Sequence, residues 1–177
     1  MLSVLDEGSL RFRGLEIPIK DLWSPDGEGL FQAVVEMNGC TAAFVSPQGL
    51  LLTNHHCVMN AIQNASTLDR DLLEEGFIAR TREQELPARN LAVRIFRSQR
   101  EITETILRGL PANASDLEIA RFIRQREQEA IATCEQRGSL RCQVFRESEG
   151  LHFWLVESLE ILDVRLVLTL PDSIALF

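Results

Sequence analysis

Residues Gly39 to Cys57 carry the clearest structural signals of the chain and read Gly-Cys-Thr-Ala-Ala-Phe-Val-Ser-Pro-Gln-Gly-Leu-Leu-Leu-Thr-Asn-His-His-Cys. Residues 41–46 are largely apolar and rich in β-forming side chains, and residues 50–53 form a second run short enough for a buried strand. Between them, Pro47-Gln48-Gly49 supplies a fixed φ at the proline and a free one at the glycine. The pattern therefore predicts two strands joined by a tight turn.

The ends of this predicted hairpin carry two of the four cysteines of the chain. A hairpin brings its ends together, so Cys40 and Cys57 could lie within reach of a disulfide that would hold His56 at the end of a core strand. Four cysteines admit three pairings, and the local one, with Cys134 bonded to Cys142, is favoured because each pair brackets a predicted turn. Two disulfides would indicate an oxidising compartment, whereas four reduced, buried thiols would suit a cytosolic protein.

The same layout, a cysteine, a hairpin and then Thr-Ala-Ala-His-Cys, surrounds the catalytic histidine of chymotrypsin-type serine peptidases. Here the corresponding residues are Thr53-Asn54-His55-His56-Cys57, and Ala61-Ile62-Gln63 follow. Further blocks are Glu-Gly-Phe-Ile-Ala-Arg-Thr-Arg at 75–82, Glu-Leu-Pro at 85–87 and Asp-Val-Arg-Leu-Val at 163–167. Together they resemble the dipeptidyl-peptidase 7 and 11 family of bacterial serine exopeptidases. The similarity extends over nearly the whole chain, which covers only the N-terminal minority of such an enzyme.

The resemblance implies a mainly β protein with a helical insertion, an α+β fold that contains part of a chymotrypsin-like β-barrel. Residues 1–177 would form the N-terminal part of a trypsin-like peptidase domain, with the helical insertion at about residues 99–137. The resemblance also implies that His56 is the catalytic general base of an enzyme that releases dipeptides from the N-termini of peptides. Imidazole suits this role because it titrates near neutral pH. The alternative is a hydrogen-bonded histidine of the core.

The resemblance further implies that three parts of the catalytic site lie outside this sequence. They are the acid that orients the histidine, the serine nucleophile in a Gly-Asn-Ser-Gly type of turn, and an Asn-Trp loop that holds the amino terminus of the substrate. The sequence ends at Leu176-Phe177, where the family tends towards a glycine-rich continuation. We therefore expect the chain alone to be inactive. The alternative is a non-catalytic binding or scaffold module, or a decayed gene fragment, derived from such a peptidase.

The other candidates for chemistry carry weaker signals. His55 is expected to be structural, because on a strand-like backbone it would point away from its neighbour. A zinc site at His55-His56-Cys57 is disfavoured, because adjacent residues rarely bind one metal and no second ligand pair has zinc-site spacing. His152 is expected to be a core or surface histidine. We expect no cofactor and no metal. The resemblance implies a peptide substrate as the partner, and a homodimer is possible for the complete enzyme.

Composition and charge narrow the possible functions. The 18 basic and 26 acidic residues give a formal net charge of −8, which argues against non-specific binding to nucleic acid. No run of about 18 apolar residues is present, so no membrane span is expected. The start, Met1–Gly8, lacks the basic and apolar regions of a signal peptide. A location in the periplasm or at the surface of a Gram-negative bacterium is therefore expected from the cysteines and the resemblance.

Local signals predict the remaining elements. Asn38-Gly39 predicts a hairpin turn that pairs the preceding strand with residues 41–46. A helix should begin at Ser115, because Ser115 and Glu118 have the spacing of a capping box, and Gly138 should end it. Further strands are predicted at 30–37, 91–97, 142–145, 151–156 and 164–170, and helical segments at 58–63 and 98–109.

Overall fold

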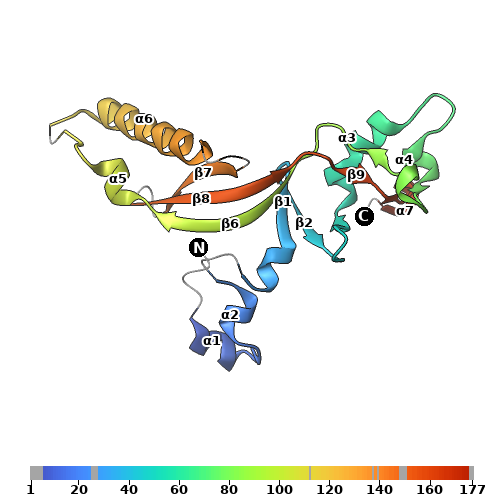
Figure 1. Cartoon of the computed structure of the whole chain (residues 1–177), viewed down its shortest axis with the longest axis horizontal. Coiled ribbons are helices and arrows are strands. Elements are labelled where there is room, and N and C mark those ends of the chain that lie inside the picture. The colour runs from blue at the N-terminus through green and yellow to red at the C-terminus, as the bar shows by residue number, and fades with distance from the viewer. Residues whose placement is uncertain are drawn as a thin grey trace. The chain divides into compact units, whose positions relative to one another are not determined.

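The computed structural model describes residues 6–24, 28–111, 113–136, 138, 140–147 and 151–175. They combine strands and helices in an α+β fold, which confirms the expected fold class (Figure 1). The chain divides into two compact units: unit 1 comprises Met1–Gln32 and Phe96–Leu159, and unit 2 comprises Ala33–Ile95 and Glu160–Phe177. Met1–Leu5 and Leu176-Phe177, on which the expectations about the two ends of the chain rest, lie outside the described residues.

The main sheet has the strand order β3-β2-β1-β6-β8-β7. Its strands are β1 (Val34–Met37), β2 (Cys40–Phe44), β3 (Leu51–Thr53), β6 (Val93–Glu101), β7 (Leu140–Glu147) and β8 (His152–Ile161). β1 pairs antiparallel with both β2 and β6, and β7 pairs antiparallel with β8. Because the order has two ends, at β3 and β7, this sheet is open, and the described residues contain no closed barrel.

Both turns flanking β2 form where the sequence predicts them. Between β1 and β2, Asn38 and Gly39 have φ values of 48° and 87°, the positive values that a two-residue hairpin favours. Met37 consequently lies opposite Cys40. The turn between β2 and β3 contains Gly49, whose φ is also 87°. Both predicted hairpins are therefore confirmed.

Unit 2 places its helices and short strands around two cores. Its further elements are α3 (His55–Ala65), α4 (Leu72–Glu75), β4 (Phe77–Ile78), a 3-10 turn (Arg82–Gln84), β5 (Leu86–Pro87), β9 (Arg165–Leu166), β10 (Leu168–Thr169) and α7 (Asp172–Ala175). The strand predicted at 164–170 is two short strands instead, because β9 pairs with β5 whereas β10 pairs with β4. One core contains Ala61, Ile62, Leu72, Phe77, Ala88 and Leu166, and the other contains Val35, Met37, Ala42 and Val93. The helical segment predicted at 58–63 is thus part of a longer helix anchored in the first core.

Unit 1 is built around a helix that packs on strand β7 (Figure 1). Its helices are α1 (Glu7–Phe12), α2 (Ile19–Leu22), α5 (Thr103–Leu107) and α6 (Asp116–Glu135), and a 3-10 turn (Leu30–Ala33) leads into β1. α6 starts at the predicted capping box, where the backbone N–H and the hydroxyl of Ser115 donate to Oε2 of Glu118 at 2.8 and 2.6 Å. The core of unit 1 contains Ile102, Ile106, Cys134, Cys142, Phe153 and Leu155.

One helix prediction in unit 1 is wrong at its start. Residues 98–101 extend β6 instead of beginning a helix, and α5 is confined to Thr103–Leu107. At the end of β6, the N–H of Ile102 donates to the carbonyl of Phe153 at 2.8 Å. Long-range pairing thus overrides the local helical pattern. No helix in the described ranges has the length and apolar character that crossing a membrane demands.

Candidate functional site

The two adjacent histidines lie on the first turn of α3, which corrects the expectation that they end a strand. β3 ends at Thr53, and Asn54 follows as the N-cap residue with φ −73° and ψ 146°. These extended angles direct the chain into a helix that begins at His55, and the N–H of Cys57 donates to the carbonyl of Asn54 at 3.1 Å. Since successive residues of a helix are about 100° apart, the two imidazoles have different surroundings.

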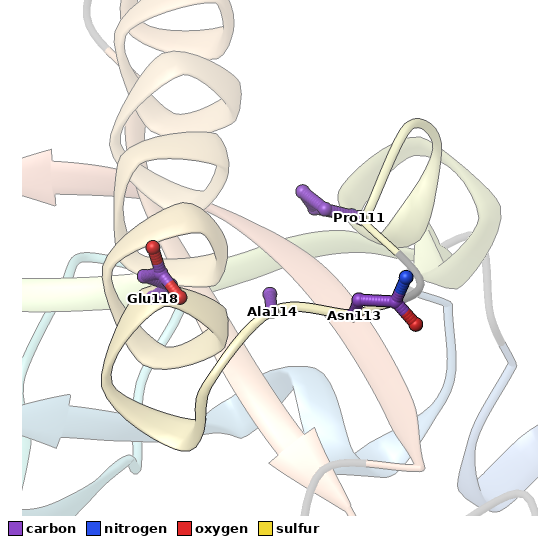
Figure 2. A pocket seen from close by; sticks show the side chains of 4 residues that line it. All are labelled: Pro111, Asn113, Ala114 and Glu118. Atoms are coloured by element: carbon purple, nitrogen blue, oxygen red, sulfur yellow. The ribbon is translucent and has the colours of Figure 1, made fainter.

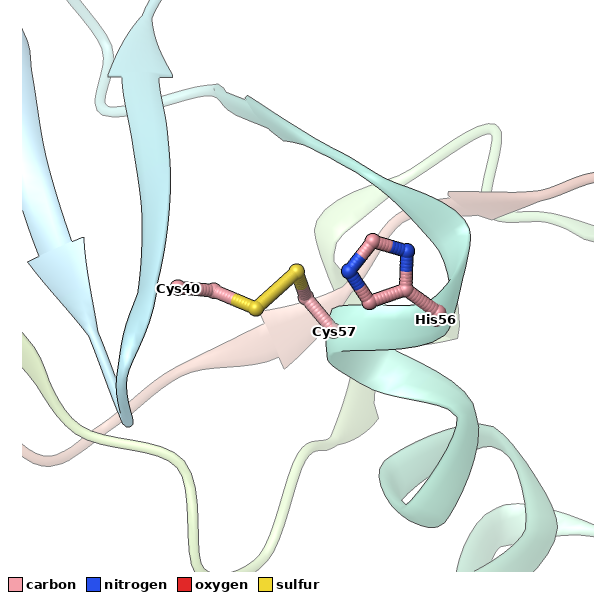
Figure 3. A group of neighbouring side chains, drawn as sticks. All are labelled: Cys40, His56 and Cys57. Atoms are coloured by element: carbon pink, nitrogen blue, oxygen red, sulfur yellow. A yellow bond between two sulfur atoms is a disulfide. The ribbon is translucent and has the colours of Figure 1, made fainter.

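A disulfide connects the start of β2 to the first turn of α3. The Cα atoms of Cys40 and Cys57 are 6.0 Å apart, and a second disulfide joins Cys134 to Cys142, so the local pairing is confirmed. Figure 3 shows the ring of His56 beside the first disulfide, with a ring nitrogen within 4.8 Å of both sulfur atoms. Because these sulfurs are bonded to each other, they are not thiolate ligands for a metal.

The imidazole of His56 is exposed. In residues 6–175, apart from the gaps given above, no hydrogen bond or ion pair of this ring is found. The helix behind it is well anchored, since Ala61 and Ile62 are 2% and 0% exposed. Val58, one turn from the histidines, packs against both cores of unit 2. An accessible imidazole on a firmly packed helix can exchange a proton with a group brought to it.

His55 has the opposite environment. Its side chain is 11% exposed, and its Nε2 lies 2.7 Å from Oδ1 of Asp172, whose side chain is 32% exposed. Asp172 is the first residue of α7 and lies 117 residues further along the chain. No spacing or motif points to this partner, because Pro171-Asp172 predicts only the end of a strand. The structural role expected for His55 is consistent with this contact.

The third histidine and two surface hollows involve other residues. His152 is exposed at the start of β8, and its Nδ1 is 2.8 Å from Oε1 of Glu101. A hollow of about 370 Å³ in unit 1 is lined by Pro111, Asn113, Ala114 and Glu118 (Figure 2). Another, of about 390 Å³ in unit 2, is lined by Arg70, Phe77, Ile78, Arg80, Glu83, Gln84 and Leu86. In the hollow of unit 1, the hydroxyl of Ser115 donates a hydrogen bond to the Glu118 carboxylate and lowers the pKa of that group. The exposed ring of His56 is therefore the candidate site.

The chain is similar to peptidases along its whole length. The model of the family described as Peptidase S46 matches residues 1–177. The chain is 35% identical to the Asp/Glu-specific dipeptidyl-peptidase of Flavobacterium psychrophilum over 178 residues, which are 100% of this chain and 25% of the relative. It is 31% identical to dipeptidyl-peptidase 7 of Capnocytophaga gingivalis over 177 residues, which are 98% of this chain and 24% of the relative.

The fold is similar to that of a solved peptidase. The crystal structure of Porphyromonas endodontalis DPP11 in complex with the dipeptide Arg-Glu matches 95% of this chain with a TM-score of 0.84 and 28% sequence identity. The match covers 25% of that chain. The present chain thus spans about a quarter of the length of the proteins it resembles. Because the family model matches every residue of the sequence, the chain belongs to the S46 family of peptidases.

Proposed function

We propose that this chain supplies the general base, His56, of a serine exopeptidase that releases dipeptides from the N-termini of peptides. The observation that carries the proposal is the exposed His56 ring beside the Cys40–Cys57 disulfide, on a helix packed into the core. The names of the relatives, dipeptidyl-peptidases, support the reaction class. A histidine in this setting takes the proton of a serine hydroxyl as the oxygen attacks the peptide carbonyl, and returns it to the departing amine.

The rest of the catalytic machinery is proposed to come from polypeptide outside these 177 residues. It comprises the serine, the acid that orients His56 and the loop that binds the amino terminus of the substrate. Asp172 contacts His55, so we do not assign it the role of the acid that orients His56. Without nucleophile and acid, the chain alone is expected to release no dipeptide.

The proposal also covers the location of the protein, its place in the peptidase domain and its assembly. Two disulfides suit an oxidising compartment, and the proposed location is the periplasm or the surface of a Gram-negative bacterium. The chain is proposed to be the N-terminal part of a trypsin-like peptidase domain, in which α5 and α6 form the helical insertion. Its partners are peptides with a free amino terminus. A homodimer of the whole enzyme is a further prediction, which light scattering of the purified protein tests.

The test uses a chimera in which these residues replace the matching segment of the Flavobacterium psychrophilum enzyme, to which they are 35% identical. Fluorogenic dipeptidyl substrates with acidic and with uncharged second residues are both supplied, because one relative is named Asp/Glu-specific and the name of the other states no preference. We expect dipeptide release, and a loss of about 10⁴-fold or more in kcat for His56→Ala. The matched variant His152→Ala should retain activity.

Three outcomes would overturn the proposal. Full activity of the His56→Ala chimera would remove the general base from this position. Dipeptide release by the 177-residue chain alone would show that the machinery is not missing. A folded chimera that binds peptide but releases nothing, with His56 in place, would support the non-catalytic binding module instead.

A further inference from the structure

We infer that Asp172 is a positioning residue for the general base: by binding His55, it fixes the first turn of α3 and thereby the direction of the neighbouring His56 ring. The inference deepens the proposed function and rests on it, because it assigns a task in the same reaction to the histidine next to the base. The primary observation is the contact of 2.7 Å between Nε2 of His55 and Oδ1 of Asp172.

The turn that carries His56 is anchored on both sides of that residue. The residue after it, Cys57, is bonded to Cys40 at the start of β2. The residue before it, His55, contacts Asp172 on α7. The packed helix holds the C-terminal side of this turn, and the contacts of the residues before and after His56 further restrict the direction of its side chain. Of the three consecutive side chains, His56 is the exposed one.

Asp172 can serve as an anchor because the packing of unit 2 holds its own segment. Thr169 is 6% exposed and lies opposite Phe77 in the pairing of β10 with β4. Pro171, next to Asp172, packs on Gly76, where an added Cβ would lie 2.9 Å from Cδ of the proline. Gly76 also has a φ of 73°, so both the space and the backbone conformation favour glycine there. The segment that presents the carboxylate is therefore closely packed.

Charge and proton position also fit this role. The first turn of α3 has no acidic side chain of its own, and a carboxylate near a helix N-terminus is favoured by the helix dipole. A carboxylate accepts hydrogen bonds, so we assign the N–H of His55 to Nε2, which donates a hydrogen bond to Oδ1 of Asp172. His55 is thus engaged as a donor within a shielded contact. His56 is the histidine of the pair that remains accessible to a reacting hydroxyl.

The test is NMR of the 177-residue chain. The chain has three histidines, so single variants assign every imidazole signal. We expect long-range ¹H–¹⁵N spectra to show a proton on Nε2 of His55. We also expect NOEs between the ring of His56 and the β-protons of Cys40 and Cys57. In Asp172→Ala, which removes the acceptor, the His56 NOEs should be lost while the disulfide stays intact.

Matched variants separate positioning from general stability. Asp172→Glu restores the carboxylate and should recover the NOEs. Asp163→Ala removes a carboxylate that pairs with Arg165 at the surface of the same unit, and it should leave the NOEs unchanged. His55→Ala breaks the contact from the other side, and combining it with Asp172→Ala should add no further change.

NOEs that persist in Asp172→Ala would overturn the inference, and so would their loss in Asp163→Ala. If Asp172→Ala unfolds unit 2, as collapsed amide dispersion would reveal, His55→Ala decides, and retained NOEs in that variant overturn the inference. The proposed function fails on a separate observation, an active chimera with His56→Ala. The two failures are therefore distinguishable.

Discussion

Each unit contains a disulfide and a histidine–carboxylate contact, but the two units differ in which of these interactions is buried. In unit 1 the disulfide is the buried device, since Cys134 and Cys142 are 1% and 4% exposed and belong to the core. The contact of His152 with Glu101 lies at the surface, with side chains 51% and 44% exposed. In unit 2 the disulfide is half-buried, and the histidine–carboxylate contact is the shielded device.

The contrast between the units indicates how a fold can hold one reactive side chain at its surface. In unit 1 the disulfide closes the connection between α6 and β7 and contributes to packing. In unit 2 the disulfide ties a strand to the start of a helix, and the shielded contact with Asp172 adds a second anchor. The imidazole between the two anchors stays exposed. A core is stabilised in one case, and a surface residue is held in place in the other.

The largest effect that separates the units is expected from Phe153→Ala. Phe153 is 0% exposed in the core of unit 1, and truncation of a buried phenylalanine costs about 3–5 kcal/mol. Both tryptophans of the chain, Trp23 and Trp154, lie in unit 1. Urea denaturation followed by tryptophan fluorescence should therefore show a lower unfolding midpoint.

The control for this variant is Ile62→Ala in unit 2, at a residue that is also 0% exposed and whose truncation costs roughly 2–5 kcal/mol. We expect it to shift the fluorescence transition less than Phe153→Ala does, because the probes lie in unit 1. Equal shifts for the two variants would show that the units unfold together, and the comparison would lose its basis.

Removing each disulfide in turn separates an effect on stability from an effect on activity. The bonds join residues separated by 17 and 8 positions, so the loop-entropy model gives about 3 kcal/mol for Cys40–Cys57 and about 2.5 kcal/mol for Cys134–Cys142. Despite these similar costs, replacing both cysteines of the first pair by alanine should sharply lower kcat of the chimera. Replacing the second pair should lower the thermal midpoint and leave kcat nearly unchanged. Equal losses of kcat would contradict this prediction.

Gly76→Ala tests the support behind Asp172. Gly76 has φ 73° and ψ 177°, a region that essentially only glycine adopts, so alanine should cost roughly 1–3 kcal/mol for the backbone alone. Pro171 and the Thr169 carbonyl would each come within 2.9 Å of the added Cβ, and this crowding should displace the aspartate. NMR should then show a weakened Nε2–H signal of His55. Gly49→Ala is the matched control, because φ there is +87° and an added Cβ meets nothing within 4 Å. A signal lost equally in both variants would refute the role of crowding.

The smallest effect concerns pH and the surface contact of unit 1. Hydrogen bonds from His152 first and Thr103 second lower the pKa of Glu101 from its ordinary value of 4.5. Because the folded state has the lower pKa, this stabilisation is complete above the unfolded-state value and is lost as the pH falls through the folded-state value. Glu101→Gln should flatten the unfolding free energy over that acidic range, measured by urea denaturation. The change is small because both side chains are exposed; an unchanged profile would refute it.

Local chemistry made much of the fold predictable. The Asn38-Gly39 turn and the capping box at Ser115 form where they are predicted, because each depends on a positive φ or on hydrogen bonds within a few residues. Prediction failed where distant pairing decides the structure. Residues 98–101 stay in β6 next to β8, and 164–170 divides between two partner strands.

The candidate site was also predictable only in part. The contact of Cys40 with Cys57 follows from the hairpin, since a hairpin determines where its own ends lie. The helical backbone at His55 and His56 was missed, because a strand and a helix meet there within two residues of Thr53. Asp172 could not be predicted, because its contact spans 117 residues and no local pattern marks it.

The spacing of the disulfides has a consequence for how the protein matures. Each bond joins cysteines that are consecutive among the cysteines of the chain. A polypeptide that is oxidised as it emerges, amino terminus first, brings Cys40 and Cys57 together before Cys134 appears, and Cys142 follows its partner soon afterwards. The first available pairing is the native one at each stage, and short loops close at the lowest entropic cost. Maturation should therefore require little thiol–disulfide exchange to correct wrong bonds.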